Sequence, residues 1–189
     1  MNIGIYGGAF NPIHTGHLIL AQNAMEEYNL SKVFFVVSAN PPHKTDREMV
    51  SFEHRFNMTS LAVADCQNFA VTDIEKEIEG KSYTYYVLEK IMDKYGKDNN
   101  YFLIIGEDEA NYFDKWFRYE DILKMCRVVV GHRENTLPKN NIKFEYLKTP
   151  LIEISSSDIR ERIKSERSVL FYTSKSVEDY IKENRLYIK

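Results

Sequence analysis

The sequence contains few cysteines and no long apolar run. Its 189 residues include two cysteines, Cys66 and Cys126, which lie far apart and form no C-x-x-C pair. We therefore expect both to be small, buried, reduced side chains, as in a cytosolic protein. No apolar run approaches the ~18 residues of a membrane-spanning helix, and the N-terminus lacks the basic segment of a signal peptide. A cytoplasmic protein with no membrane partner is expected.

The sequence also lacks a surplus of positive charge. It has 25 Lys and Arg against 28 Asp and Glu, a formal net charge of −3. Proteins that bind nucleic acids usually carry a basic surplus, so nucleic acid is not an expected partner. The hydrophobic fraction of 43% and the length are those of one ordinary globular domain, which we expect to span residues 1–189. A homo-oligomer is left open.

Apolar runs and helical patterns alternate along the chain. Strands are expected at 3–6, 33–37, 69–71, 101–105 and 127–131, and helices from Gly16, after Ser51, over 84–95, around 119–125, after Ser155 and over 177–184. Several of the strand runs are nearly continuous in apolar residues, as in strands covered on both faces. The alternation predicts an α/β fold with a doubly wound parallel sheet.

Glycine-rich or polar runs follow the expected strands. They are Gly7-Gly8, Pro41-Pro42-His43-Lys44, Gly106-Glu107-Asp108 and the turn before Ser155. Ligands of doubly wound sheets bind beyond the carboxyl ends of the strands, so these runs are expected to converge on one crevice. By contrast, the charged stretch 75–81 is interpreted as a solvated edge, and 132–141 as a loop.

The stretch YGGAFNPIHTGHL places two histidines at the start of an expected helix. Gly7 and Gly8 are expected to let the backbone turn sharply and approach a ligand closely. The helix start offers free N–H groups and a positive dipole end to an anion. His14 and His17, with Gly16 leaving room between them, can both donate hydrogen bonds to one phosphate. A metal pair is the less favoured alternative, because no third ligand is near.

This stretch resembles the G-G-x-F-(D/N)-P-x-H-x-G-H signature of a nucleotidyltransferase superfamily. Further stretches resemble, in order, motifs of the bacterial nicotinate-nucleotide adenylyltransferases: NPPHK (40–44), SFEHR (51–55), KSYTYYVL (81–88), GEDEANYFDKW (106–116), ISSSDIR (154–160) and SVEDYIKENRLY (176–187). The resemblance covers nearly the whole chain. It implies a Rossmann-like doubly wound sheet of the nucleotidyltransferase type. It also implies adenylyl transfer from ATP to nicotinate mononucleotide in NAD biosynthesis, giving deamido-NAD and pyrophosphate.

The chain departs from the family pattern at a few positions. Ala9 stands where Thr or Ser is common, Asn11 where Asp is common, and Glu107 where a small residue is usual. None of these departures removes a residue assigned to phosphate chemistry. Two alternatives stay open: nicotinamide mononucleotide as the main substrate, and a non-catalytic protein that binds ATP as a sensor.

The implied reaction depends on positioning and electrostatics, because the attacking phosphate oxygen is already ionised at pH 7. The resemblance implies four catalytic residues: His14, His17, Lys44 and Arg160. It implies ATP-binding residues Gly7, Gly8, Phe10, Gly16, Gly106, Asp108, Ser155 and Ser156, and nicotinate-nucleotide-binding residues Ser82, Tyr83, Thr84, Tyr112 and Trp116. Mg²⁺ is expected to arrive with the ATP phosphates, with no metal ligands from the protein.

Individual roles follow from the resemblance. His17 would contact the α-phosphate, and Arg160 the β and γ phosphates. Asp108 would accept from a ribose hydroxyl, and Trp116 would stack on the nicotinate ring, with N–H groups near Thr84 and Tyr112 receiving its carboxylate.

Structural alternatives stay open for several of these residues. Trp116 could be a core residue, Arg160 could lie on an exposed helix, and Lys44 could be a solvated surface charge. Arg55 is expected to be structural, paired with a nearby acid.

Overall fold

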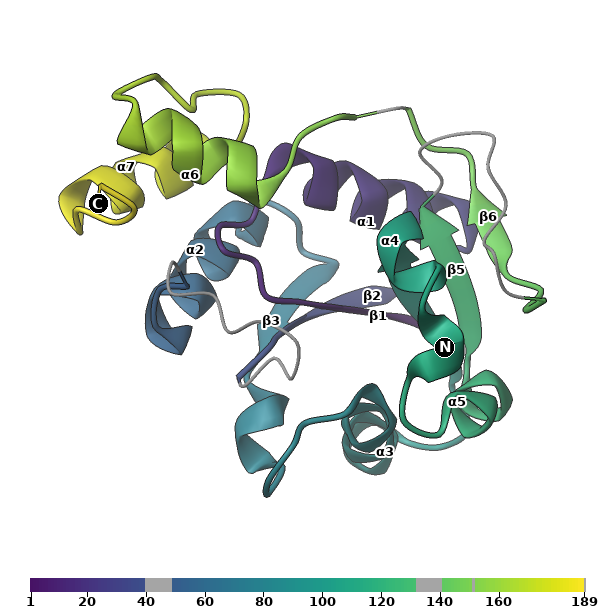
Figure 1. Ribbon diagram of the computed structural model, residues 1–189. Coiled ribbons are helices and arrows are strands. Elements are labelled where there is room, and N and C mark those ends of the chain that lie inside the picture. The colour runs from purple at the N-terminus through teal and green to yellow at the C-terminus, as the bar shows by residue number, and fades with distance from the viewer. Residues whose placement is uncertain (40–48, 132–140, 151, 189) are drawn as a thin grey trace.

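A parallel sheet forms the centre of the fold in the computed structural model, which describes residues 1–39, 49–131, 141–150 and 152–188 (Figure 1). In these residues the sheet has six strands: β1 (Asn2–Gly8), β2 (Lys32–Val37), β3 (Phe69–Thr72), β4 (Asn100–Gly106), β5 (Arg127–Gly131) and β6 (Glu145–Leu147). Their order is β3-β2-β1-β4-β5-β6, and every neighbouring pair is parallel. The expected doubly wound sheet is confirmed.

The strand order reverses between β1 and β4. The chain moves outward from β1 through β2 to β3, then crosses to β4 on the other side of β1 and continues to β6. Such a reversal opens a crevice at the carboxyl ends of the two central strands. Gly8 and Gly106 are the last residues of those strands, so the runs that follow them meet at this crevice.

Helices connect the strands and lie on both faces of the sheet (Figure 1). They are α1 (Thr15–Glu27), α2 (Phe52–Val63), α3 (Thr84–Tyr95), α4 (Glu107–Ala110), α5 (Tyr119–Met125), α6 (Ser156–Lys164) and α7 (Lys175–Glu183), with 3₁₀ turns at Ile74–Glu77 and Phe113–Lys115. Ser51, Ser155 and Ser174 cap three of the helices by accepting backbone N–H groups. Gly96, with φ +99°, ends α3 as expected.

The core has two layers because alternate strand residues point to opposite faces of the sheet. Ile3 and Ile5 of β1 pack with the cluster that includes α3 and α5. Tyr6 packs with the cluster that includes α1, α2 and α7. Burial on both faces explains why the strand sequences are continuously apolar. None of the helices in the described ranges is both long and apolar enough to cross a bilayer.

Three expectations need correction. The stretch 75–81 is not a solvated edge throughout, because Glu75 is only 7% exposed: the turn that buries Ile74 in the core also carries Glu75 inward. Cys66 is partly rather than fully buried, while Cys126 is buried as expected. The edge strand β6 was not predicted, since three residues carry too short a pattern to detect. Lys44 and nearly all of 132–141 lie outside the described residues.

Candidate active site

The chain turns after β1 at a different place from the one expected. Gly7 and Gly8 stay in the strand, paired with Val36 and Val37 of β2. The positive φ that the turn needs, +45°, occurs at Phe10 instead. The expectation that the glycines form the turn is therefore wrong. A Cβ added to Gly7 would meet no atom within 4 Å, so the strand end faces open space in which a ligand can approach the backbone.

The two histidines form a stacked pair at the start of α1. His14 is the residue before the first turn, and the centroids of the two rings are 3.6 Å apart with an interplanar angle of 28°. The Nδ1 of His17 accepts a hydrogen bond of 3.1 Å from the backbone N–H of His14. An accepting Nδ1 puts the proton of the neutral ring on Nε2. The Nε2–H of His17 is therefore the group that can donate to a phosphate oxygen.

Gly16 and Phe10 shape the space around this pair. A Cβ on Gly16 would lie 3.1 Å from Nδ1 of His14, so glycine leaves the room that the ring needs, as expected. The Phe10 ring meets His17 edge-on at 5.1 Å and is only 2% exposed. The buried Phe10 ring thus packs against the imidazole of His17 and restricts its orientation.

Arg160 reaches from α6 to the loop between β1 and α1. It is 7% exposed, so the alternative of an exposed helix decoration is wrong. Its Nη1 donates to the carbonyl of Asn11 at 3.0 Å, and its Nη2 donates to Ser157 at 3.3 Å. A guanidinium has five N–H donors. The same side chain can therefore hold the loop and present charge at the crevice.

The two serines at the start of α6 have internal hydrogen-bond partners. The Ser155 hydroxyl donates to Asp158 at 2.6 Å within a capping box, and Ser156 donates to the carbonyl of Pro12 at 2.9 Å. Because a hydroxyl has a single proton, neither side chain donates to a phosphate in this arrangement. What α6 offers an anion is its N-terminal backbone and Arg160.

Arg55 joins α2 to the ends of β1 and β2. It is 1% exposed, and its Nη1 donates to the carbonyls of Ala9 and Ser38, both at 2.8 Å. Burial lowers its pKa below the ordinary arginine value. The expected structural role is confirmed, but its hydrogen bonds go to carbonyl groups rather than to an acid. Ala9 contributes only its carbonyl here, so the altered side chain at this position leaves the link intact.

At the end of β4, two neighbouring carboxylates face different ways. Asp108 is exposed in the first turn of α4, beside the crevice. Glu107, in contrast, is only 9% exposed. Its charge acts on Tyr146, whose pKa is raised first by the burial of the Tyr146 hydroxyl and further by Glu107. Gly106 leaves little room, since a Cβ there would lie 2.6 Å from Glu109. Asp108 is thus the exposed carboxylate of the two, and its contact with a ribose hydroxyl stays a prediction.

The start of α3 is held by a buried carboxylate. Ser82 donates to Glu75 at 2.6 Å, and the backbone N–H of Ala39 donates to the same oxygen at 2.9 Å. Burial raises the pKa of Glu75, although these two hydrogen bonds oppose the shift. Glu75 therefore ties the segment just before α3 to the segment just after β2. The sequence analysis missed it, because a Glu among charged neighbours carries no signal of burial.

Phe117 is a second residue that the sequence analysis missed. Its ring stacks on Tyr83 with centroids 4.7 Å apart. Tyr112 is 60% exposed, and its N–H already donates to the carbonyl of Glu109 at 3.1 Å. Trp116 is partly buried and packs 5.0 Å from Phe113. The structure thus brings Phe117 to the start of α3, where the first N–H groups have no acceptor within the helix.

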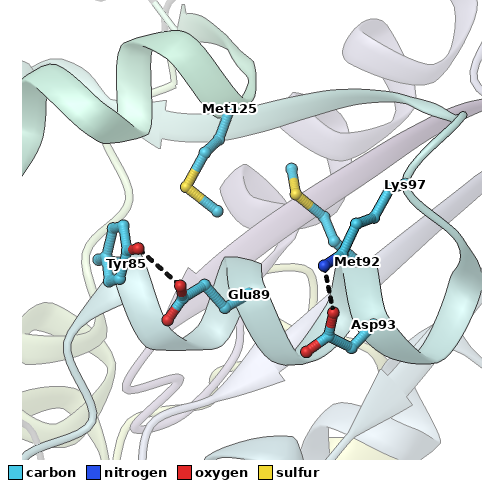
Figure 2. Close-up of a pocket in the computed structure, with 6 residues that line it drawn as sticks. All are labelled: Tyr85, Glu89, Met92, Asp93, Lys97 and Met125. Atoms are coloured by element: carbon cyan, nitrogen blue, oxygen red, sulfur yellow. Dashed lines mark hydrogen bonds and ion pairs between the residues drawn. The ribbon is translucent and has the colours of Figure 1, made fainter.

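A separate pocket lies between α3 and α5 (Figure 2). Its lining residues are Tyr85, Glu89, Met92, Asp93, Lys97 and Met125. Tyr85 donates to Glu89 at 2.6 Å, and Lys97 pairs with Asp93 at 2.9 Å, so the charged groups in it have partners. It contains none of the predicted site residues and is not the candidate site.

Comparison with known proteins also indicates a nucleotidyltransferase. The family model described as Cytidylyltransferase-like matches residues 5–162. The chain is 35% identical over 187 residues to a protein of Lactococcus lactis subsp. lactis (strain IL1403) named "Probable nicotinate-nucleotide adenylyltransferase", covering 99% of this chain and 95% of that one. A protein of the same name from Lachnoclostridium phytofermentans is 34% identical over 198 residues, covering 98% of each. This chain belongs to the nicotinate-nucleotide adenylyltransferases of the cytidylyltransferase-like family.

This chain has the same fold as a solved structure titled "Plasmodium falciparum nicotinic acid mononucleotide adenylyltransferase complexed with NaAD". The TM-score is 0.79 at 21% identity, covering 98% of this chain and 97% of that one. The nucleotidyltransferase-type, Rossmann-like sheet implied by the motifs is thereby confirmed.

Proposed function

We propose that this chain transfers the adenylyl group of ATP to nicotinate mononucleotide, a step of NAD biosynthesis, and releases pyrophosphate. The observation that carries the proposal is the stacked pair His14 and His17 at the start of α1, beside the reversal point of the sheet. The relatives that this chain matches over nearly its full length are named for that reaction.

The reaction forms one P–O bond and breaks another. A phosphate oxygen of nicotinate mononucleotide attacks the α-phosphorus of ATP, and the bond to the leaving pyrophosphate breaks. Negative charge grows on the α-phosphate oxygens and on the leaving group. The Nε2–H of His17 donates to the α-phosphate, and the guanidinium of Arg160 neutralises the leaving group. We also assign Lys44 to the phosphates by its motif, although it lies outside the described residues.

The nicotinate nucleotide is proposed to bind between α3 and the 112–117 turn. The N-terminal N–H groups of α3, at Thr84 and Tyr85, favour a carboxylate through hydrogen bonding and the helix dipole. The Tyr83–Phe117 stack and the nearby Trp116 offer aromatic surface to the ring. A neutral amide would lose the attraction between the helix dipole and a negative charge, so we expect the site to bind the acid more tightly than the amide.

We propose that Mg²⁺ enters as the MgATP complex, as part of the substrate. In the ranges that the structure describes, no three His, Cys, Asp or Glu side chains gather as a metal cage. With MgATP as the substrate, Mg²⁺ keeps the ATP phosphates and water as its main ligands. We also propose that the enzyme works in the cytoplasm, where its two free cysteines would stay reduced.

Pyrophosphate release tests the proposed function. The assay contains ATP and Mg²⁺ with either nicotinate mononucleotide or its amide, and it compares wild type, His17→Ala and His54→Ala. His54 serves as the matched control, because it contacts Tyr180 between α2 and α7 instead of the crevice. We expect turnover with the acid, a loss of about 10²-fold or more in His17→Ala, and near wild-type rates in His54→Ala.

Other outcomes would contradict the proposal in distinct ways. Equal turnover with the amide would overturn the acid preference assigned to the α3 terminus. Binding of ATP without turnover of either nucleotide would favour the sensor alternative.

A further inference from the structure

The loop that leads to the histidine pair is held from the last third of the chain. Three consecutive carbonyl groups, of residues 11–13, each accept a hydrogen bond from that region. Arg160 donates to the first at 3.0 Å, Ser156 to the second at 2.9 Å, and Thr173 to the third at 2.9 Å. In the described ranges no strand pairs with residues 11–13, so these donors help to set the path of the loop.

The side chain of Asn11 is held as well. The Tyr187 hydroxyl donates to Oδ1 of Asn11 at 2.8 Å, and the backbone N–H of Val50 donates to the same oxygen at 3.3 Å. Tyr187 is 8% exposed and Asn11 is 5% exposed, so the hydrogen bond is shielded from water. Two donors on one oxygen also fix the orientation of the amide. Burial raises the pKa of Tyr187, so its hydroxyl stays protonated as the donor.

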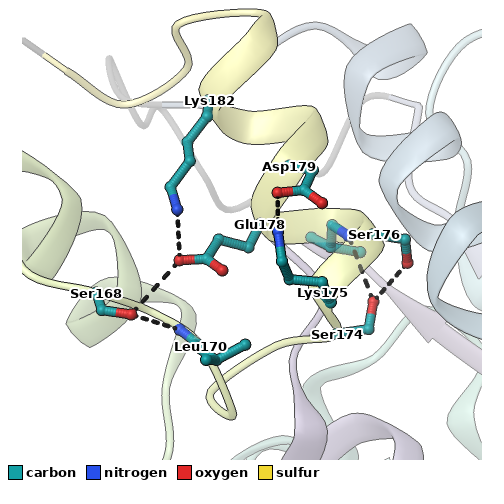
Figure 3. A network of polar contacts seen from close by, with 9 residues as sticks. Ser168, Leu170, Ser174, Lys175, Ser176, Glu178, Asp179 and Lys182 are labelled. Atoms are coloured by element: carbon teal, nitrogen blue, oxygen red, sulfur yellow. Dashed lines mark hydrogen bonds and ion pairs between the residues drawn. The ribbon is translucent and has the colours of Figure 1, made fainter.

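The helix that precedes Tyr187, α7, is held by polar contacts and by core packing (Figure 3). Glu178 of α7 is 3% exposed and accepts from Lys182 at 2.8 Å and from Ser168 at 3.5 Å. Val177 and Ile181 of the same helix are buried in the core. Tyr187 lies in the turn that follows α7 and is buried in the same core cluster, so packing sets its position relative to the sheet. It can transmit that position to Asn11.

We propose that Tyr187 is a positioning residue for the reaction: through Asn11 it holds the loop in the conformation that stacks His14 on His17. Asn11 lies three residues before His14, and the intervening carbonyl groups are bonded as described. Removing the hydroxyl takes away the shorter of the two hydrogen bonds to Oδ1 of Asn11, which loosens the amide and lets the histidine pair shift. The kinetic part of this proposal rests on the proposed function, whereas the conformational part does not.

Two hydroxyl deletions separate positioning from general stability. Tyr187→Phe removes the bond to Asn11. Tyr180→Phe removes a hydroxyl from α7 that contacts His54 and Asn57, each at 3.0 Å, and does not touch the loop. We expect Tyr187→Phe to lower kcat by about 10-fold or more, with KM for nicotinate mononucleotide nearly unchanged. Tyr180→Phe should keep kcat within about twofold of wild type.

The second measurement is independent of turnover. In ¹H–¹³C spectra of the free protein, the ring Cε1–H signals of His14 and His17 should move in Tyr187→Phe and stay in place in Tyr180→Phe. Unchanged signals together with unchanged kcat in Tyr187→Phe would overturn the proposal. The proposal would also be overturned if Tyr187→Phe and Tyr180→Phe lost kcat equally and in proportion to their loss of stability. If wild type shows no turnover, the proposed function fails, and the histidine signals still decide the role of Tyr187.

Discussion

At the level of single residues, internal hydrogen bonds decide which polar atoms can meet a substrate. Ser82 and Ser155 were both predicted to bind ligand, yet each donates its hydroxyl proton to a neighbouring carboxylate, Glu75 or Asp158. A hydroxyl that donates internally can only accept from a ligand, and neither phosphate nor carboxylate supplies a proton at pH 7. Among the predicted site residues that the structure describes, negative substrate groups are therefore left mainly to imidazole, guanidinium and backbone N–H groups.

The buried Glu75 should make stability depend on pH. Burial raises its pKa above the ordinary 4.5, so the folded state binds this proton more tightly than the unfolded chain does. The resulting stabilisation is complete below pH 4.5 and is lost as pH rises through the raised value. Glu75→Gln, neutral at every pH, should therefore gain stability relative to wild type as pH rises.

Urea unfolding between pH 4 and pH 8 measures this difference. Glu77→Gln is the matched control, because Glu77 is exposed in the same 3₁₀ turn. A pH-independent difference between Glu75→Gln and wild type would show that Glu75 has no shifted pKa.

At the level of elements, short local signals place the helix ends. Ser51 and Ser155 cap α2 and α6 at the positions that the sequence pattern predicts, whereas Ser174 caps an α7 that begins at Lys175, two residues before the expected start. Strand ends are different. Gly7 and Gly8 look like a turn in the sequence, but pairing with β2 keeps them extended.

Two glycine substitutions should distinguish a glycine required by backbone strain from a glycine that leaves space for a ligand. Gly96 has φ +99° and ψ 138°, a conformation that nearly excludes other residues, so Gly96→Ala should destabilise the protein by about 1–3 kcal/mol. Gly7 lacks a positive φ, and a Cβ there meets no atom within 4 Å. Gly7→Ala should therefore leave the free energy of unfolding nearly unchanged while it weakens ATP binding. Denaturant unfolding and calorimetric titration with ATP measure the two effects, and the reverse pattern would contradict this assignment.

At the level of the whole molecule, the crevice joins segments that are distant in sequence. The reversal of strand order brings Gly8 beside Gly106, and α6 and the segment before α7 return from the last part of the chain to the β1–α1 loop. Binding of ATP there should involve both halves of the sheet at once. It should therefore stabilise the fold as a whole.

Thermal unfolding with ATP tests this expectation. A ligand present at 100 times its Kd stabilises the folded state by about 2.7 kcal/mol, so the Tm should rise steadily with MgATP concentration. His17→Ala should show a smaller rise, and chelation of Mg²⁺ should reduce the rise for wild type. A Tm that does not respond to ATP would place nucleotide binding elsewhere.

Most of the fold could be predicted from the sequence, because its signals are local. Continuous apolar runs mark the central strands, and capping serines and Gly96 mark helix ends within a few residues. The H-x-G-H stretch, with Gly16 between its histidines, is likewise a local signal: it places within four positions the histidine pair that we propose for the phosphate chemistry. The three-residue strand β6 and the burial of Glu75 carry no comparable local pattern.

The sequence by itself determined the alternation of strands and helices, the family and the histidine pair. Only the tertiary structure decided that Tyr187 holds Asn11, that Phe117 stacks on Tyr83, and that Glu75 links β2 to α3. The physical reason is the sequence separation of the interacting residues. Capping and periodic burial act over a few residues, whereas a hydrogen bond between residues 176 positions apart exists only after the sheet and its helices have packed.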